Sequence, residues 1–289
     1  MGQVTLENWF ARPLKGFFYS LVRQPPMTRT NFPIPVSRPA GPLREYVSYY
    51  WLSLDNADDT YSVLPDGAVD VVVTVGTTSC QLDVFGTTTS RTELPLGVGS
   101  HYLGIRFKPG QSRHFLDVPA SELTNSNQSA EGLFLPNILG VAESITADNL
   151  FSRLDAALLG HLKQRPPRHL RIDDAIRHIE SMRGTSRVSQ LANMYGKSCR
   201  QFERNFLDVV GVPAKLFAGI VRFQHASMLL ARSALPLAQI AAELGYTDQS
   251  HLTHEFSRFY GYPPSRAREH VAFLQDAGRL PDNNELPFT

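Results

Sequence analysis

Cysteine is scarce in this chain of 289 residues, and its two thiols, Cys80 and Cys199, are too few for a disulfide framework. The sequence also lacks a Cys-x-x-Cys pair and a His-x-His pair, so it offers no familiar arrangement of metal ligands. The longest apolar stretch near the N-terminus, Phe17 to Val22, is too short for a signal peptide or a membrane span. We therefore expect a cytoplasmic protein with neither a metal site nor a membrane segment.

Candidate catalytic residues are equally sparse. The first 160 residues contain two histidines, His101 and His114, whereas a metal-dependent barrel enzyme needs a cluster of histidines and carboxylates. Cys80 lies in the polar stretch TTSCQL, without a neighbouring base that would activate its thiol. These absences argue against an enzyme, and we expect no catalytic residue and no cofactor. A barrel-type enzyme remains an alternative.

What the sequence does contain is a pattern that occurs twice in its C-terminal third. The stretch from Leu191, LANMYGKSCRQFERNFLDVVGVPA, is repeated in outline from Ile240, IAAELGYTDQSHLTHEFSRFYGYPP. Key residues recur at a shift of 49 or 50 positions: Ala192 and Gly196 match Ala241 and Gly245, and Phe206, Gly211 and Pro213 match Phe256, Gly261 and Pro263. The duplication indicates two copies of one structural unit.

Each copy has the layout of a helix-turn-helix, in which a small residue on the first helix allows close packing and a glycine four positions later makes the turn. Ser198 is suited to begin the second helix of the first copy, with Gln201 completing a capping box, and Asp248 takes the equivalent place in the second copy. Between the copies, residues 213–234 carry an apolar stripe typical of one long helix. About nineteen helical residues make a strut of roughly 28 Å, which would hold the two motifs at a fixed separation.

This arrangement resembles the DNA-binding domain of the AraC/XylS family of bacterial transcription regulators, over residues 170–270. The resemblance rests on the two A-x-x-x-G turns, on the run LLARSALPLAQIAAELGYTDQSHLTHEFSRFYGYPP and on the phenylalanine-to-glycine-proline endings. Ala214 and Arg187 depart from the family pattern, which has proline and a capping serine or threonine at these places. The resemblance implies a sequence-specific regulator that places two recognition helices in adjacent major grooves of DNA, with RNA polymerase as a further partner.

On each second helix, the face opposite the buried phenylalanines holds the candidate DNA contacts. In the first copy these are Arg200, Gln201, Glu203 and Arg204, and an arginine can bind O6 and N7 of guanine with two hydrogen bonds. In the second copy the corresponding face carries five polar side chains: Gln249, Ser250, His251, Thr253 and His254. We expect the first copy to supply most of the base discrimination and the second to add adenine and phosphate contacts. The alternative is that both faces are merely solvated.

The charge distribution agrees with a nucleic-acid partner for the same region. The net charge of the chain is +1, but residues 166–272 carry +5, from 14 lysines and arginines against 9 acidic residues, whereas residues 1–165 and 273–289 each carry −2. The basic part is therefore the part with the duplicated motif, as attraction to DNA phosphates requires, although a solvated surface alone can also carry such a charge.

The preceding part of the sequence reads as a β-rich domain. Short strands are expected at 46–54, 61–65, 68–75, 80–86 and 101–110, separated by turns rich in glycine, aspartate and threonine. The phrases VLPDGAVDVVVTVG and LGIRFKPG resemble a sensor-type domain of some AraC-family proteins, and barrel-like sensor domains of that family bind small effectors. The side chains that could line such a pocket are Tyr49, Tyr50, Trp51, His101, Tyr102 and Arg106. Ordinary packing is the alternative for each of them, and a partner protein in place of a small effector is the alternative for the domain.

A helix is predicted at the end of this domain from the spacing of apolar residues in DNLFSRLDAALLGHLKQR. Its apolar stripe, which includes Leu150, Leu154 and Leu158, either packs on its own sheet or forms the contact of a homodimer. Pro166 and Pro167 then end the helix.

The expected architecture is therefore α+β with two domains. The expected ranges are 1–165 for a β-rich, barrel-like regulatory domain with an arm at 1–40, 170–271 for an all-α domain with helix-turn-helix motifs at about 188–209 and 237–260, and 272–289 for a tail. The expected partners are double-stranded DNA, RNA polymerase, a small-molecule effector and a second copy of the chain.

Overall fold

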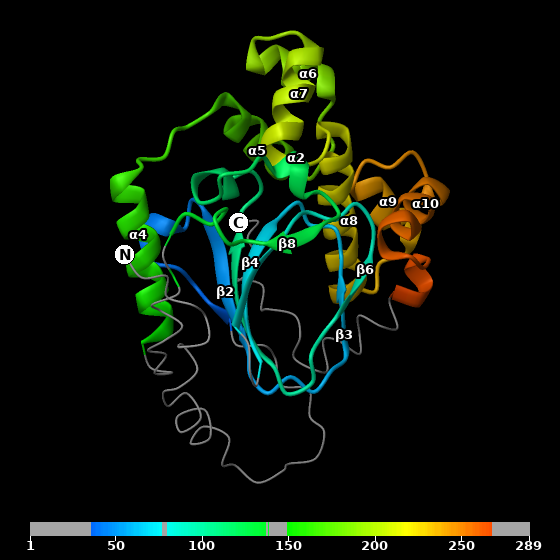
Figure 1. Cartoon of the computed structure of the whole chain (residues 1–289). Helices are drawn as coiled ribbons and strands as arrows, with labels where there is room; N and C mark the ends of the chain where they lie inside the picture. Colours follow the sequence, from blue (N-terminus) through cyan, green and yellow to red (C-terminus); the bar gives the residue numbers. More distant parts are fainter. Residues whose placement is uncertain (1–35, 77–79, 137, 139–148, 268–289) are drawn as a thin grey trace, which may run out of the picture.

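The structure is a computed structural model that describes residues 36–76, 80–136, 138 and 149–267. Within these ranges a β-rich part is followed by a group of helices (Figure 1), and this confirms the predicted α+β class. Of the predicted arm, only residues 36–40 are described, and the predicted tail 272–289 lies outside the described residues.

Eight strands are present in the described residues: β1 (Val36–Ser37), β2 (Val47–Ser53), β3 (Thr60–Val63), β4 (Val69–Val75), β5 (Cys80–Phe85), β6 (Thr92–Pro95), β7 (His101–Phe107) and β8 (Asn127–Ser129). The five strands predicted from the sequence correspond to β2, β3, β4, β5 and β7. Of the other three, β1 and β8 have two and three residues, too few for an alternating pattern to indicate a strand, and β6 has four, one of them a proline, which argues against a strand in the sequence.

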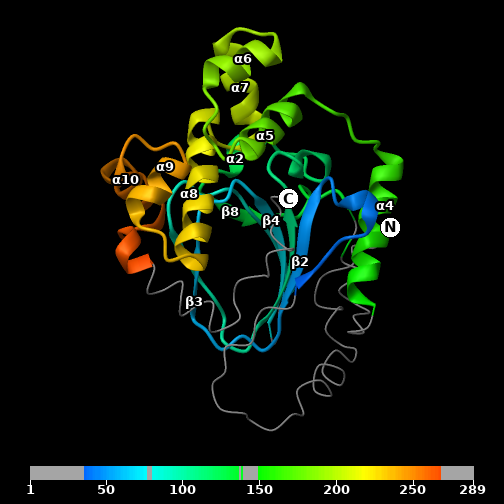
Figure 2. The same cartoon turned by 180° about the vertical axis from the view of Figure 1, so that it is seen from behind.

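Six strands form one antiparallel sheet in the order β1-β2-β7-β4-β5-β8, and β3 pairs with β6 in a separate two-stranded sheet. The expectation of a barrel-like domain needs correction on this point, because the described strands form no closed barrel. β1 and β8 are edges at opposite ends of the order, and both are short. Figure 2 shows β3, one strand of this pair, below α8 and away from β2 and β4 of the large sheet.

The helices follow in chain order: η2 (Gly41–Leu43), η3 (Ser112–His114), α2 (Ala120–Leu123), α4 (Leu150–Gln164), α5 (Arg171–Ser181), α6 (Val188–Tyr195), α7 (Cys199–Val210), α8 (Ala214–Arg232), α9 (Leu237–Glu243) and α10 (Gln249–Tyr260). The pairs α6–α7 and α9–α10 span residues 188–210 and 237–260, beside the predicted motif ranges of about 188–209 and 237–260, and α8 is the long helix predicted between them.

Helix α4 packs on the large sheet of its own chain. Leu150, Leu154 and Leu158 are at most 1% exposed and belong to the core that the sheet forms. The Tyr50 ring stacks on Phe151, and the Tyr50 hydroxyl donates a hydrogen bond to the carboxylate of Asp155 at 2.8 Å. The dimer contact expected at the three leucines is therefore corrected, because side chains buried within one chain present no surface to a second copy.

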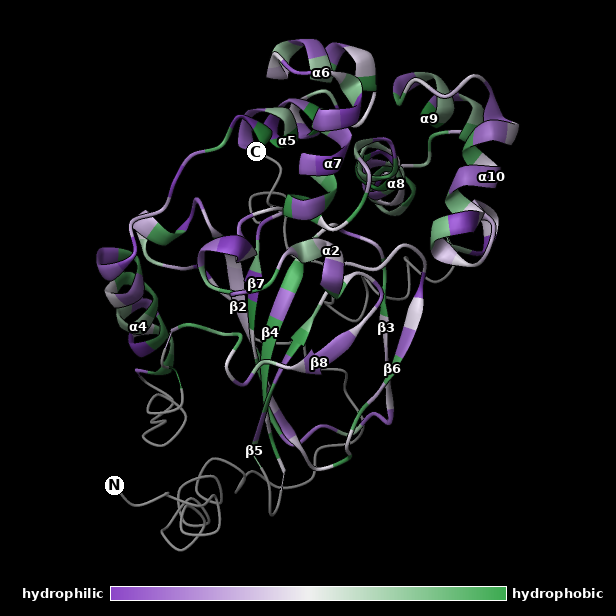
Figure 3. Cartoon of the chain, turned by 45° about the horizontal axis from the view of Figure 1, so that its top comes forward, coloured by the Kyte–Doolittle hydropathy of each residue, from purple (hydrophilic) through white to green (hydrophobic). Residues whose placement is uncertain are grey.

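The described residues form two separate hydrophobic cores. One core runs from Leu43 to Leu158 and fills the space between the large sheet and α4, and the other runs from Ile172 to Ala267 and lies among helices α5 to α10. Figure 3 shows the apolar stretches of β4 and α8 in the interior of these two parts. The phenylalanines that recur in the two motifs, Phe206 and Phe256, are fully buried in the second core, as their spacing predicts.

Candidate nucleic-acid interface

Both second helices of the repeated motif begin at the residues predicted to cap them. At the start of α7, the Ser198 hydroxyl accepts a hydrogen bond from the backbone N–H of Gln201 at 3.3 Å. At the start of α10, the Asp248 carboxylate accepts one from the backbone N–H of His251 at 2.8 Å. Each cap satisfies a backbone donor that would otherwise have no partner within the helix, so it fixes where the exposed face of that helix begins.

The exposed face of α7 carries the predicted DNA contacts of the first motif. Phe202 and Phe206 are fully buried on the opposite side. Three of the four predicted contacts are exposed and the fourth is half-buried: Arg200, Gln201 and Arg204, and then Glu203. With Leu207 and Pro213, these four side chains line one hollow of about 530 Å³. Two guanidinium groups and a carboxylate in one open hollow can form hydrogen bonds with base edges and phosphates.

The corresponding face of α10 is polar but has fewer charged groups. Four of the five predicted contacts are exposed on it, namely Gln249, Ser250, His251 and His254. Two of the five make local bonds: the Thr253 hydroxyl donates to the carbonyl of Gln249 at 2.9 Å, and His251 accepts a bond at Nδ1 from the N–H of Thr247 at 3.4 Å. The His251 ring also lies edge-on against Tyr246, with centroids 5.2 Å apart. His251 and Thr253 are thus engaged within their own motif.

Helix α8 connects the two faces. It has 19 residues, so it is about 28 Å long. Phe217 lies with its ring centroid 5.8 Å from that of Phe206 in α7, and Phe223 lies 5.1 Å from Phe256 in α10. An ion pair between Arg222 and Glu255, with N and O atoms 2.9 Å apart, ties α8 to α10 as well. Helices α7 and α10 are therefore both packed on α8.

The six side chains proposed for an effector pocket do not face one space. Tyr50 points into the core toward α4 and is fully buried, whereas Trp51 belongs to the other face of the large sheet. His101 and Tyr102 lie at the start of β7, where the His101 ring accepts a bond from the N–H of Asp55 and the Tyr102 hydroxyl accepts one from the N–H of Gly97. Because neighbouring residues of a strand point to opposite faces, Tyr50 lies on one face of the sheet, whereas Tyr49, Trp51, Tyr102 and Arg106 share the other. Binding of an effector by this shared face stays a prediction.

Arg106 is the centre of a charged cluster on the face of the sheet that Trp51 shares. Its guanidinium lies 2.8 Å from the Asp70 carboxylate and 2.7 Å from that of Asp66, and it also donates a hydrogen bond to the Tyr49 hydroxyl at 3.1 Å. Burial raises the pKa of Asp66, an effect that the charge of Arg106 opposes. The two aspartates were missed as site residues, although both stand in the phrase VLPDGAVDVVVTVG.

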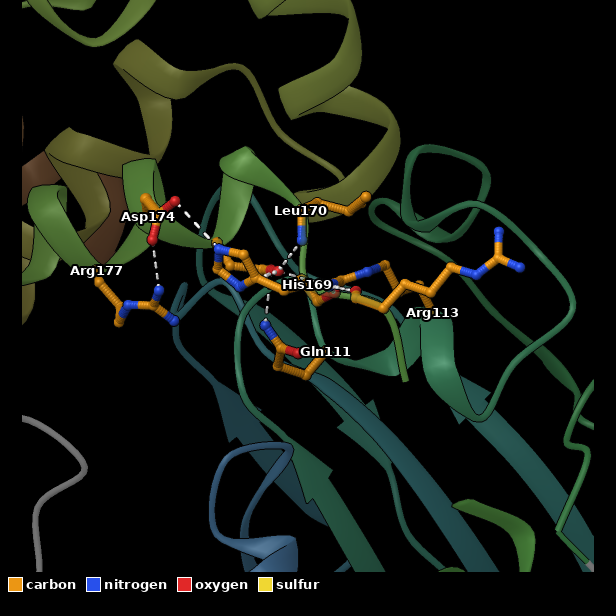
Figure 4. Close-up of polar contacts among 9 residues, drawn as sticks. Gln111, Arg113, His169, Leu170, Asp174 and Arg177 are labelled. Atoms are coloured by element: carbon orange, nitrogen blue, oxygen red, sulfur yellow. Dashed lines mark hydrogen bonds and ion pairs between the residues drawn. The ribbon is translucent and has the colours of Figure 1, made fainter. Parts of the chain in front are cut away.

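A second polar cluster joins the β-rich part to α5 (Figure 4). Asp173, only 4% exposed, accepts hydrogen bonds from the Gln111 amide at 3.0 Å and from the N–H of Leu170 at 2.7 Å, and it forms an ion pair with Arg113 at 2.8 Å. Its neighbour Asp174 binds His169 and Arg177 in turn (Figure 4). No local sequence pattern indicates this cluster, because its members come from two distant parts of the chain.

Two further classes of feature are not found in the part of the chain that the structure describes. No described helix is both long and apolar enough to cross a membrane. No group of three or more histidine, cysteine, aspartate or glutamate side chains that could hold a metal ion occurs within 36–76, 80–136, 138 and 149–267.

Comparison with known families assigns the two parts separately. Residues 191–270 match the family described as a helix-turn-helix domain, and residues 36–129 match a domain of unknown function, DUF6597. The C-terminal part of this chain is thus a helix-turn-helix domain. This agrees with the resemblance to the AraC/XylS family that the duplicated motif indicates.

Similar proteins are bacterial regulators, and the similarity covers a limited part of each. The HTH-type transcriptional regulator ExsA of Pseudomonas aeruginosa is 30% identical over 83 residues, which are 29% of this chain and 30% of that protein. The virulence regulon transcriptional activator VirF of Yersinia enterocolitica is 27% identical over 110 residues, or 38% and 39% of the two chains. The RCS-specific HTH-type transcriptional activator RclR of Escherichia coli is 31% identical over 107 residues, or 37% and 38%. This chain therefore spans between 30% and 39% of the length of these relatives.

Similar solved structures include the DNA-binding domain of AdpA, a global transcriptional factor, in complex with a target DNA. It is 22% identical with a TM-score of 0.34, and the match covers 37% of this chain and 96% of that one. ToxT from Vibrio cholerae O395 is 10% identical with a TM-score of 0.40, and the match covers 77% and 98%.

Proposed function

We propose that this chain is a sequence-specific DNA-binding transcription regulator that places α7 and α10 in two adjacent major grooves on one side of a duplex. The observation that carries the proposal is the pair of exposed polar faces on helices that one 19-residue helix, α8, holds together. The length of α8, about 28 Å, is of the order of the distance of roughly 34 Å after which the major groove faces the same side again.

The two helices read different sequences in this proposal. The hollow on α7 presents Arg200 and Arg204, which suit guanine, and Glu203, which can accept a hydrogen bond from cytosine N4. On α10, Gln249 suits adenine, and Ser250 and His254 suit phosphates or bridging water. The operator is therefore expected to combine one G·C-containing box with a box in which adenine is preferred.

Selection from randomised duplexes with the purified chain tests this function directly. We expect an enriched site with two boxes about one helical turn apart, and we expect the affinity for that site to fall steeply when salt is raised from about 50 to 200 mM, because phosphate contacts release counterions. Failure to enrich any sequence, together with an affinity that does not change with salt, would refute the proposal.

The β-rich part is proposed to modulate DNA binding or contact with RNA polymerase. For a small effector, the candidate surface is the sheet face that carries Trp51, Tyr102 and Arg106. For a partner protein, the candidate surface includes Leu54 and Val98, which are 40% and 71% exposed in neighbouring turns at one end of the sheet. Calorimetry with candidate metabolites, and selection repeated in their presence, separates these two possibilities.

The domain limits are proposed from the same reasoning. Residues 1–165 would form the regulatory part and residues 170–271 the DNA-binding part, with motifs at about 188–209 and 237–260. In this function the protein acts at the bacterial nucleoid and catalyses no reaction. The leucine stripe of α4, first expected to join two copies of the chain, is buried within one chain. Sedimentation of the purified chain is therefore the measurement that decides its oligomeric state.

A further inference from the structure

The C-terminal end of α7 rests on the β-rich part. The hydroxyl of Thr124 donates a hydrogen bond to the carbonyl of Gly211, the residue that ends α7, at 2.5 Å. Gly211 has φ +90°, and a Cβ at this position would lie 2.9 Å from the carbonyl oxygen of Ala120 and 3.0 Å from Cγ2 of Thr87. A glycine is therefore needed here for its left-handed backbone and for the close approach.

The C-terminal end of α10 rests on the same part of the molecule. The backbone N–H of Arg91 donates to the carbonyl of Phe259 at 3.0 Å. The Arg91 guanidinium lies over the rings of Tyr260 and Tyr262, at 5.9 and 5.5 Å from their centroids. Gly261 ends α10, and a Cβ there would lie 3.8 Å from Cδ of Arg91.

One short segment makes contact at both places. Residues 87–91, here called the bridging segment, connect β5 to β6, and four positions of fully extended chain reach at most about 14 Å. The segment is fixed within the β-rich part, because the N–H of Asn125 donates to the carbonyl of Thr87 at 2.9 Å and the side chain of Asn125 accepts from the N–H of Thr89 at 2.8 Å.

The two ends of the bridging segment contact equivalent residues of the two motif copies. Gly211 and Gly261 are equivalent positions of the two motif copies. Thr87, at one end of the bridging segment, meets the first glycine, and Arg91, at the other end, meets the second. Figure 3 shows the same arrangement at the level of elements, with α2 beneath the end of α7 and β6 leading toward α10. The two recognition helices are thus connected twice, through α8 and through the bridging segment.

We propose that the bridging segment sets the separation of the two recognition helices, and with it the spacing between DNA boxes that the chain accepts. Arg91 and Thr124 are then positioning residues for DNA reading, although they lie outside the helix-turn-helix domain. The part of this inference that concerns DNA rests on the function proposed above, whereas the part that concerns the separation of the helices does not.

The separation can be measured without DNA by pulsed electron–electron resonance between two spin labels. Cys199 is exposed at the start of α7 and supplies one label site, Ser250→Cys on α10 supplies the other, and Cys80→Ser removes the second natural thiol. We expect Arg91→Ala combined with Thr124→Val to broaden or displace the distance distribution. Ser90→Ala, an exposed side chain of the same segment, is the matched control and should leave it unchanged. A distribution in the double variant that is identical to the parent would overturn the proposal.

The consequence for DNA is tested on duplexes in which one or two base pairs are added between the selected boxes. Each added pair turns one box by about 35° relative to the other, so we expect the parent chain to lose about tenfold or more in affinity. The double variant should lose much less, and its affinity for a duplex with a single box should match that of the parent. The same spacing profile in both proteins would contradict the proposal. If the parent binds no preferred sequence, the proposed function fails, and the label distances still decide whether the bridging segment acts.

Discussion

Glu180 offers a pH-dependent test of how the β-rich part and α5 are joined. This residue of α5 is half-buried, and burial raises the pKa of its carboxyl from 4.5 to about 7, against the opposing charges of Lys108 and Arg177. Lys108 directly follows β7, so the ionisation of Glu180 is coupled to a group on the other side of the junction. Replacing Glu180 with glutamine fixes this position in a neutral form of nearly the same shape.

The size of the effect follows from the two pKa values. Between pH 4.5 and 7 the folded chain holds a proton on Glu180 that the unfolded chain releases, so the contribution to stability is fully present below pH 4.5 and is lost as pH rises through 7. A change from 4.5 to about 7 corresponds to at most about 3 kcal/mol. Because the side chain is partly exposed, solvent screening reduces this, and we expect about 1–2 kcal/mol.

Urea unfolding of the parent chain and of Glu180→Gln at pH 5, 6, 7 and 8 measures this difference. We expect the two proteins to have similar free energies of unfolding at about pH 5, and the variant to be more stable by about 1–2 kcal/mol at about pH 8. All other titrating groups are shared, so they cancel in the comparison. A difference between the two proteins that stays constant from pH 5 to 8 would refute the assignment of a raised pKa to Glu180.

Three further changes test separate parts of the structure. Arg204→Ala should cost about 1–3 kcal/mol at the selected DNA site and spare non-specific binding in a titration with labelled duplexes, and equal losses on both would make Arg204 a phosphate contact. Leu154→Asp should cost more than about 3 kcal/mol in thermal unfolding because it buries an unpaired charge, whereas an equally stable chain that sediments at half the mass would restore the dimer contact. Gly67→Ala should cost about 1–3 kcal/mol in urea unfolding, because Gly67 has φ +72° and its Cβ would lie 2.5 Å from Cε2 of Phe217, while the control Gly41→Ala, with open space around it, should be nearly neutral.

The helical part of the fold could be predicted closely because its signals are local. A capping residue, a turn glycine and buried phenylalanines at helical spacing all lie within about 25 residues of one another, and Ser198, Asp248, Phe206 and Phe256 take the expected roles. The exposed faces of α7 and α10 follow from the same periodicity. Their contacts with DNA bases stay predictions.

The β-rich part could be predicted less fully from the sequence, because its contacts are long-range. Strand positions follow from composition, but the order of strands and the edges of the sheet depend on pairings that a single sequence does not display. The proposed effector pocket grouped Tyr50 with Trp51 as neighbours in sequence, although adjacent strand residues face opposite sides. The clusters around Asp173 and Arg106 join residues about 60 and 40 positions apart, so no local pattern reveals them.

The close fit of Gly67 against Phe217 has a consequence for engineering. The turn that contains Gly67 belongs to the β-rich part, and Pro65 in the same turn accepts a weak hydrogen bond at its carbonyl from Gln224 of α8 at 3.4 Å. A chimera that joins a foreign helix-turn-helix domain to this β-rich part after Pro167 would place a side chain other than Phe217 against that turn. We expect such a chimera to unfold in one cooperative transition only when the surface of α8 around Phe217 and Gln224 and the turn with Pro65 and Gly67 come from the same protein.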